Sequence, residues 1–243
     1  MKVCRFPWDA LPPVWIHAAE SAVKQHPAYA AAKGGDPDSA FELVKDHLSS
    51  LIVNELMQAF RGWSPILISA HAVERTGVNA IPEALADLLA QRLGWSVDSG
   101  VVQINIVAHT GADGFSRLAR QAIFDGPVTA GERYLLVDDF VGQGGTLANL
   151  RAHVMQGGGM VVGATALTGK SYSANLRLTM VTLEKVRLKH GKELENWWIE
   201  RFGFGFDCLT ESEARYLLNT SDAERIRNRI VAAVEARGGK ASA

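Results

Sequence analysis

The sequence predicts an α/β fold, in which a mainly parallel sheet is flanked by helices and helical segments are added at the N- and C-terminal ends. Three observations predict this fold class. Four apolar runs, near Ile66, Ile104, Leu136 and Val162, are separated by stretches of helical periodicity, as in a sheet built from right-handed crossovers. The run from Leu135 to Val137 is apolar at consecutive positions, which is typical of a central strand covered on both faces. After residue 170 only helical patterns follow, so that part is expected to lie outside the sheet.

Length and composition favour one elaborated domain. The 243 residues are expected to form an N-terminal appendage over 1–35, a core over 36–170 and a helical C-terminal region over 171–243. Net charge is −1 with Lys and Arg scattered, so no nucleic-acid surface is indicated. Cys4 and Cys208 lack metal-ligand spacing, and neither a signal-peptide core nor a bilayer-length apolar run is present. We therefore expect a cytoplasmic protein with a small-molecule partner and no nucleic-acid or membrane partner.

The individual elements follow from periodicity and from end signals. The appendage holds a short amphipathic stretch from Val14 to Val23, and residues 26–40 carry no functional assignment because helix packing explains them. The expected strands are Pro65 to Ser69, Val101 to Val107, Leu135 to Val137 and Met160 to Leu167. The expected helices, with a Pro or an N-cap residue at the start or a Gly at the end, are Asp36 to Phe60, Pro82 to Leu93, Thr146 to Gln156, Ser171 to His190 and Lys192 to Phe202. Two capping boxes, Thr210 with Glu213 and Ser221 with Glu224, begin the last two helices.

The central strand runs directly into two acids and a glycine-rich turn. Asp138 and Asp139 come where the apolar run ends, and in parallel sheets ligands bind beyond the carboxyl ends of the strands. The turn ends at Thr146, where a helix begins, so free backbone N–H groups and the helix dipole favour a phosphate there. A dinucleotide fingerprint is excluded because Leu147 stands where its third glycine is needed. A Walker loop is excluded because its lysine is absent.

This stretch resembles the signature with which type I phosphoribosyltransferases bind phosphoribosyl pyrophosphate (PRPP). The matching positions are Asp138, Asp139, Phe140, Val141, Gly144 and Thr146, after an apolar strand. The chain departs from the family pattern at Gly142 and Gln143, where small hydroxyl residues are usual, so two donors to the 5'-phosphate are lost. The other interpretation is a strand-to-helix turn with capping acids. With its extra helical segments, the chain would be a divergent member of bacterial type.

The resemblance implies a set of site residues and a cofactor. Asp138 and Asp139 would meet the ribose hydroxyls and act on Mg²⁺ indirectly, through water or those hydroxyls. The residues expected to hold PRPP are Val141, Gly142, Gln143, Gly144, Gly145 and Thr146 in the loop, with Ser69, Arg75 and Gly77 after the first strand. Arg117 and Arg120, with His109 beside them, would form a catalytic lid over pyrophosphate, and Lys170 would contact the base. The C-terminal helices would form a hood, bringing Trp197, Trp198 or Phe204 near the base, and the family is often a homodimer.

Other interpretations stay open at several of these positions. Arg75 pairs equally well with Glu74 on an ordinary exposed loop. Arg117 and Arg120 fit the solvent-facing side of an amphipathic helix. Three functions are therefore carried forward: a phosphoribosyltransferase that joins ribose 5-phosphate to a nitrogenous base, a non-catalytic sensor of PRPP or a nucleotide, and a hydrolase that passes the phosphoribosyl group to water. The acids favour chemistry, whereas the change at Gly142 and Gln143 favours the second or third function.

Overall fold

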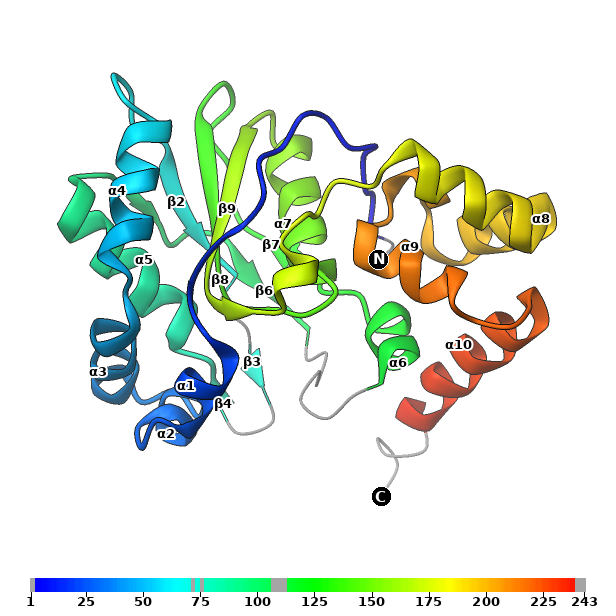
Figure 1. The fold of residues 1–243 in the computed structure, drawn as a ribbon, viewed down its shortest axis with the longest axis horizontal. Helices are drawn as coiled ribbons and strands as arrows, with labels where there is room; N and C mark the ends of the chain where they lie inside the picture. The colour runs from blue at the N-terminus through cyan, green and yellow to red at the C-terminus, as the bar shows by residue number, and fades with distance from the viewer. Residues whose placement is uncertain (1–2, 71–72, 75–76, 106–112, 239–243) are drawn as a thin grey trace.

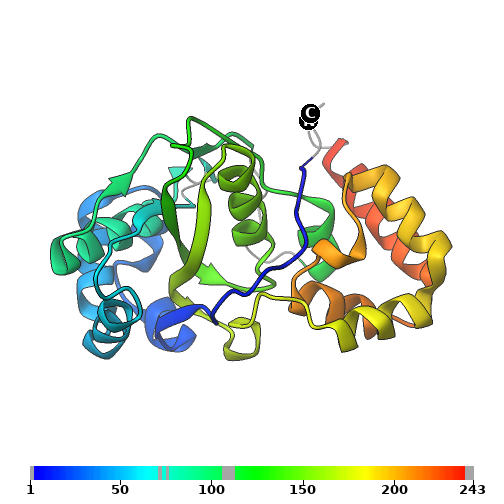
Figure 2. The same ribbon diagram turned by 90° about the horizontal axis from the view of Figure 1, so that it is seen from above.

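The computed structural model describes residues 3–70, 73–74, 77–105 and 113–238. A five-stranded parallel sheet of order β1-β9-β8-β2-β5 lies at the centre, with helices on both faces (Figures 1 and 2). Its strands are β1 (Trp15–Ala18), β2 (Ile66–Ser69), β5 (Val97–Asp98), β8 (Arg133–Val141) and β9 (Met160–Gly169). The predicted α/β class is confirmed, and β8 is the middle strand as the apolar run of Leu135 to Val137 predicts.

Helices of two different groups cover the two faces of the sheet. On one face α3 (Pro37–His47), α4 (Ser50–Ala59) and α5 (Ile81–Leu93) pack on Leu67, Leu135 and Val137. On the other face α7 (Gly145–Gln156) packs on Ile68 and Leu136. Each strand thus buries alternate side chains in two separate cores, as a doubly covered parallel sheet requires.

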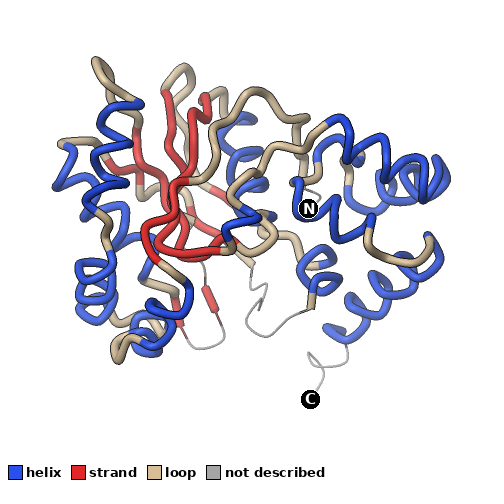
Figure 3. The backbone as a smooth tube through the Cα atoms, viewed as in Figure 1, coloured by secondary structure: helices blue, strands red, loops and turns tan. Residues whose placement is uncertain are grey.

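A third core is formed by the C-terminal helices, which lie beside the sheet and contain no strand (Figure 3). Its helices are α6 (Gly114–Ala119), α8 (Met180–Phe202), α9 (Glu211–Leu218) and α10 (Ala223–Gly238). A short 3₁₀ turn at Ser171–Ser173 lies between β9 and α8, and another at Phe206–Cys208 connects α8 with α9. Among the described residues, no helix combines the length and the apolar character that crossing a membrane would take.

The N-terminal segment contributes to the sheet, which its amphipathic pattern does not predict. Strand β1 pairs with β9 in parallel, Trp15 opposite Thr165, and two short helices follow, α1 (Glu20–Gln25) and α2 (Tyr29–Lys33). Residues 15–18, assigned above to an appendage, are therefore an edge strand of the core sheet. The remaining division into core and C-terminal region stays a prediction.

The long helix predicted from Asp36 to Phe60 is wrong, because two helices replace it. Leu48 takes an extended conformation with ψ 110°, which ends α3. The Ser49 hydroxyl then accepts a hydrogen bond from the Ile52 N–H and begins α4, while the Ser49 N–H donates to Nδ1 of buried His17 (3.2 Å). A serine N-cap and a tertiary partner thus break a continuous apolar period.

The strand predicted at Val101 to Val107 is also wrong as a member of the main sheet. Val102–Gln103 forms β6, which pairs antiparallel with β7 (Phe124–Asp125) in a separate two-stranded sheet, and Ile104 is half exposed. β5 takes the sheet edge beside β2 instead. Residues 106 and 107 lie outside the described part of the chain. Another hairpin, β3 (Val73–Glu74) with β4 (Gly77–Val78), follows β2.

The helix starts and ends predicted for the C-terminal region agree with the structure except in two places. Gly191 adopts φ 76° and ψ 167° and breaks α8 where the predicted helix closes, but residues 174–179 are not helical. The capping box of Thr210 and Glu213 is present. At the start of α10 the cap is Asp222, whose carboxylate accepts from the Arg225 N–H at 2.7 Å, and the box predicted from Ser221 is wrong.

Candidate functional site

The two acids lie at the carboxyl end of the central strand, beyond its pairing with β2. Ser69 opposite Val137 is the last pair between β2 and β8, while β8 continues against β9 to Val141. Residues Asp138 and Asp139 are 6% and 9% exposed, and their side chains touch each other through a hydrogen bond. The strand therefore carries a buried pair of carboxyls to the sheet edge where ligands of this fold class bind.

The two carboxyls are held in different protonation states. Burial, followed by the charge of Asp139, raises the pKa of Asp138 well above its ordinary value. Burial opposes ionisation of Asp139 too, but Lys33, with Nζ 2.8 Å from Oδ2, outweighs it, aided by hydrogen bonds from Asp138 and Asn79. The pKa of Asp139 is consequently lowered. The pair favours one shared proton and one negative charge, and Lys33 neutralises that charge.

Lys33 is the residue of this site that the sequence analysis missed. It ends α2, inside the segment of residues 26–40 to which no function was assigned, and its side chain is 19% exposed. No local pattern marks it, because its partner Asp139 lies on a strand far along the chain. The only signal is chemical: an acid pair buried this deeply needs a cation near it.

The glycine turn has the backbone that its sequence predicts. Gly144 adopts a left-handed conformation (φ 80°) as N-cap of α7, and a Cβ there would come within 2.4 Å of Leu176 Cδ2. The Thr210 hydroxyl donates to the Gln143 carbonyl at 2.6 Å. Because the first N–H groups of a helix lack intrahelical acceptors, the turn from Gly142 to Thr146 can offer donors to an anion.

A cavity of about 310 Å³ opens beside this turn, between the sheet region and the C-terminal helices. Its lining includes Gly142 and Gln143 of the turn and three cationic side chains, Arg117, Lys170 and Arg215. The other lining residues are Gly114, Tyr172, Ser212, Tyr216 and Asn219. Asp138 and Asp139 do not line it, so the acid pair with Lys33 lies apart from the three cations of the cavity.

The remaining residues predicted for the site fall in different places. Arg117 lies against the loop, since a Cβ on Gly142 would stand 2.5 Å from Arg117 Nη1. Arg120 is the C-cap residue of α6; its Nε is buried without a hydrogen-bond partner among the described residues, and it is not among those that line the cavity. Lys170 follows β9 and pairs with Glu20 at 2.5 Å.

The loop after β2 is described only in part. Ser69 is the buried last residue of that strand, and the backbone of Gly77 belongs to β4. Arg75 and His109 lie outside the described residues, so their proposed roles stay predictions.

A buried polar network fixes the C-terminal region to the glycine turn. Arg5 donates to both carboxylate oxygens of Glu213 (2.6 and 3.0 Å), to Asn149 in α7 and to the Gly145 carbonyl. Arg5 is 4% and Glu213 2% exposed, so neither charge is solvated. The network joins the N-terminal segment, α7 and α9 behind the turn.

The aromatic residues expected over the base have a structural role. Trp198 is fully buried against Phe202, Phe204 and Phe206 in the third core. Trp197 is partly buried at the edge of the same core. The expectation for Trp198 is therefore wrong, and α9 is the helix of this region that reaches the loop.

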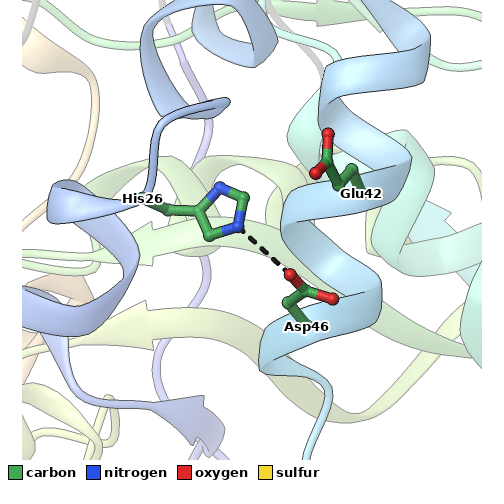
Figure 4. Close-up of side chains that lie close together, drawn as sticks. All are labelled: His26, Glu42 and Asp46. Carbon is green, nitrogen blue, oxygen red and sulfur yellow. Dashed lines mark hydrogen bonds and ion pairs between the residues drawn. The ribbon is translucent and has the colours of Figure 1, made fainter.

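A second group of ligand-type side chains lies on the outer helices, as Figure 4 shows. One atom each of His26, Glu42 and Asp46 lies within 4.8 Å of the others. His26 Nδ1 accepts the Ala28 N–H at 3.2 Å, so in the neutral ring Nε2 carries the proton and donates to Asp46 at 3.3 Å. A metal at Nε2 would require the proton on Nδ1, facing the Ala28 N–H. The geometry of His26, Glu42 and Asp46 thus favours a hydrogen bond between His26 and Asp46 over a metal site.

Comparison with known proteins gives relatives in sequence. No protein-family model matches the chain. It is 37% identical over 229 residues to a protein of Escherichia coli named TraN, covering 94% of this chain and 51% of TraN. It is also 37% identical over 148 residues to an uncharacterized protein of Haemophilus influenzae, covering 61% of this chain and 33% of that protein. The chain thus spans about half the length of the first relative and about a third of the second.

Solved structures similar to the chain include three adenine phosphoribosyltransferases. The first has a TM-score of 0.37 at 15% identity, over 57% of this chain and 74% of its own. The enzyme of Thermoanaerobacter pseudethanolicus has a TM-score of 0.34 at 19% identity, over 50% and 67%. The enzyme of Leishmania donovani has a TM-score of 0.35 at 14% identity, over 58% and 57%. These TM-scores are too low to carry an argument about this chain.

Proposed function

We propose that the protein binds PRPP and transfers its ribose 5-phosphate to a nitrogenous acceptor with release of pyrophosphate. One observation carries the proposal: a single strand, turn and helix hold a buried acid pair, a left-handed glycine and a helix N-terminus in sequence, at the carboxyl edge of the central strand. The cationic cavity beside the turn supports it, because PRPP carries several negative charges.

The turn serves as the 5'-phosphate site. A Cβ at Gly142, Gly144 or Gly145 would collide with Arg117, Leu176 or Glu213, so the glycines let these side chains pack close to the turn; of the three, Gly144 alone has a left-handed φ. The N–H groups from Gly145 to Leu147 start α7 and offer donors that require no lysine. Thr146 is partly exposed in this first turn and adds a hydroxyl donor. The donors lost at Gly142 and Gln143 are offset in part by Arg117, which lies against Gly142.

The acid pair serves the ribose. Asp139, as the ionised member, accepts hydrogen bonds from the sugar hydroxyls, while Asp138 in its protonated form donates to Asp139. Departure of pyrophosphate leaves positive charge on the anomeric carbon, and a preorganised carboxylate stabilises that charge. In this proposal Arg117 binds the leaving group and Lys170 contacts the acceptor. The parts expected of Ser69, Arg75, Gly77 and Arg120 stay predictions.

The acid pair fits Mg²⁺ in an indirect role. Carboxylate oxygens are the donors that Mg²⁺ prefers, and both acids offer them. Because Asp138 favours its proton and Lys33 neutralises Asp139, the pair presents little net charge to a cation. Contact through water or ribose hydroxyls therefore suits the site better than direct ligation. When bound, the ion neutralises the charge of pyrophosphate.

A second function, a non-catalytic sensor of PRPP or a nucleotide, is favoured by the Lys33 contact. A lysine 2.8 Å from Asp139 competes with a substrate's hydroxyls for the carboxylate and lowers the negative charge available to the reacting carbon. A phosphoribosyl hydrolase remains the third candidate, since the same acids would serve attack by water. Association into a homodimer stays a prediction.

The test is calorimetry of PRPP with Mg²⁺, followed by a pyrophosphate-release assay against a panel of bases. Binding with base-dependent release supports the transferase. Binding without release supports the sensor, and release that needs no base supports the hydrolase. As a matched pair, Asp139→Asn should lower turnover more than affinity, and Thr146→Val should lower affinity more than turnover. If the parent protein shows no PRPP binding at millimolar concentration, the proposal fails.

A further inference from the structure

The cavity between the glycine turn and α9 carries two cations, Lys170 and Arg215, besides Arg117, to which the proposed function gives a part in phosphate and pyrophosphate binding. Of the described residues that line it, three are cationic and none carries a carboxylate. Lys170 shares Glu20 with Lys24, so this trio keeps a net positive charge. Arg117 and Arg215 form no ion pair within the described part of the chain.

Two residues that line the cavity each carry a buried polar atom without a partner among the described residues. The Nε of Arg117 is a donor and the Oε1 of Gln143 an acceptor, and both are buried without a hydrogen bond among the described residues. Such atoms cost free energy unless a ligand satisfies them. The charge of the lining is the feature that a ligand meets directly: Arg215 and Lys170 favour a negatively charged group.

The size and walls of the cavity indicate the rest of the ligand. At about 310 Å³ it lies at the small end of ligand cavities, enough for one ring and its substituents. Tyr172 and Tyr216 supply aromatic surface, and Tyr216 is held edge-on against Phe115 with ring centroids 5.0 Å apart. Aromatic walls of this kind favour a planar ring.

We infer that this cavity binds a planar heterocycle bearing one anionic group, carboxylate or phosphate, and that Arg215 on α9 selects for that charge. Its role as the acceptor in transfer rests on the proposed function; its capacity to bind the anion does not. The cavity shares Gly142 and Gln143 with the turn and excludes the acid pair, so a ligand there would lie next to a bound phosphoribosyl group without contacting the carboxylates. An arginine fork matches carboxylate and phosphate oxygens in pairs, whereas a neutral base offers it no charge.

The test compares three probes by calorimetry: pyridine-3-carboxylate, its neutral amide, and phenyl phosphate. We expect the carboxylate or the phosphate to bind at least tenfold more tightly than the amide, and the tighter of the two identifies the group. Arg215→Met should remove that preference, a loss of at least about 1.4 kcal/mol, while leaving amide binding unchanged. Arg225→Met, on an exposed position of α10 outside the cavity, is the matched control and should change nothing.

Two further measurements keep the outcomes separate. Thermal unfolding verifies that Arg215→Met folds, and Arg215→Lys, which keeps charge but loses the fork, should retain part of the preference. Equal binding of amide and anions, or an unchanged preference in Arg215→Met, overturns the inference. Anion selectivity without any PRPP binding supports the anion site in the cavity and contradicts the proposed transferase. PRPP binding without anion selectivity supports PRPP binding in the proposed function and contradicts the anion site.

Discussion

Replacing Lys33 with Met removes the cation from the acid pair and keeps the length of the side chain. The gross attraction between charges 2.8 Å apart is roughly 6 kcal/mol at an effective dielectric constant of about 20. Most of that is offset by desolvation, and removing one partner of a buried pair typically costs about 3–5 kcal/mol. Because the side chains of Lys33 and Asp139 keep 19% and 11% exposure, solvent screens the pair in part, and we expect a cost somewhat below that range, about 2–3 kcal/mol of unfolding free energy at pH 7.

The assay is urea and thermal unfolding of the variant beside a matched control. For a chain of this size the loss corresponds to a fall in Tm of about 5–10 °C. Lys24→Met removes an exposed pair with Glu20, four residues away, and should cost under about 0.5 kcal/mol. In the Asp139→Asn variant, Lys33→Met should lower the free energy of unfolding by less than it does in the parent protein. The difference, which is the coupling energy of the two residues, should be at least about 1.5 kcal/mol.

The pH dependence supplies an independent check. Asp139 has a lowered pKa in the folded protein, so the stability that its ion pair contributes is present above the ordinary value of 3.8 and is lost as pH falls through the folded pKa. The difference between parent and Lys33→Met should therefore shrink in acid and vanish once Asp139 is protonated in both. If Lys33→Met is no costlier than Lys24→Met at pH 7, or if its cost does not depend on Asp139, the reasoning about this site is refuted.

Three further substitutions test neighbouring features. Gly144→Ala adds a Cβ against Leu176 at φ 80° and should lower the free energy of unfolding in urea by about 2–4 kcal/mol. The control Gly62→Ala, at φ 91° in open space, should lower it by only about 1 kcal/mol, and equal losses would contradict the argument that Gly144 is needed for packing. Asp138→Asn should stabilise the protein at pH 7, because the raised pKa of Asp138 lowers stability as pH rises above 3.8, and the gain should vanish below that pH. Because the Asn amide keeps a neutral hydrogen-bond donor to Asp139, the rate of pyrophosphate release should stay within about tenfold of the parent, and a larger loss would contradict the proposed role of Asp138. Arg5→Met strands a buried carboxylate and should cost about 3–5 kcal/mol in thermal unfolding, so a loss under about 1 kcal/mol would show that the network is dispensable.

The sequence by itself determined the features whose partners lie a few residues apart. The strand, glycine turn and helix from Arg133 to Gln156 follow from an apolar run, an acid pair and a helical period in one stretch. The capping box of Thr210 and Glu213 and the break at Gly191 were predictable for the same reason. In each case propensity and short-range hydrogen bonds agree with the fold, so little depends on distant residues.

Only the tertiary structure decided which segments share the sheet and which charges meet. The apolar runs at Trp15 and Ile104 have similar local character. The first pairs with β9 in the main sheet, whereas the second lies outside that sheet, because a run joins a sheet only where the fold brings it beside an unpaired edge strand. The contact of Lys33 with Asp139 joins residues far apart along the chain, and Arg5 with Glu213 spans 208 positions. Periodicity carries no information on such pairs, since a buried charge takes whichever opposite charge packing brings to it.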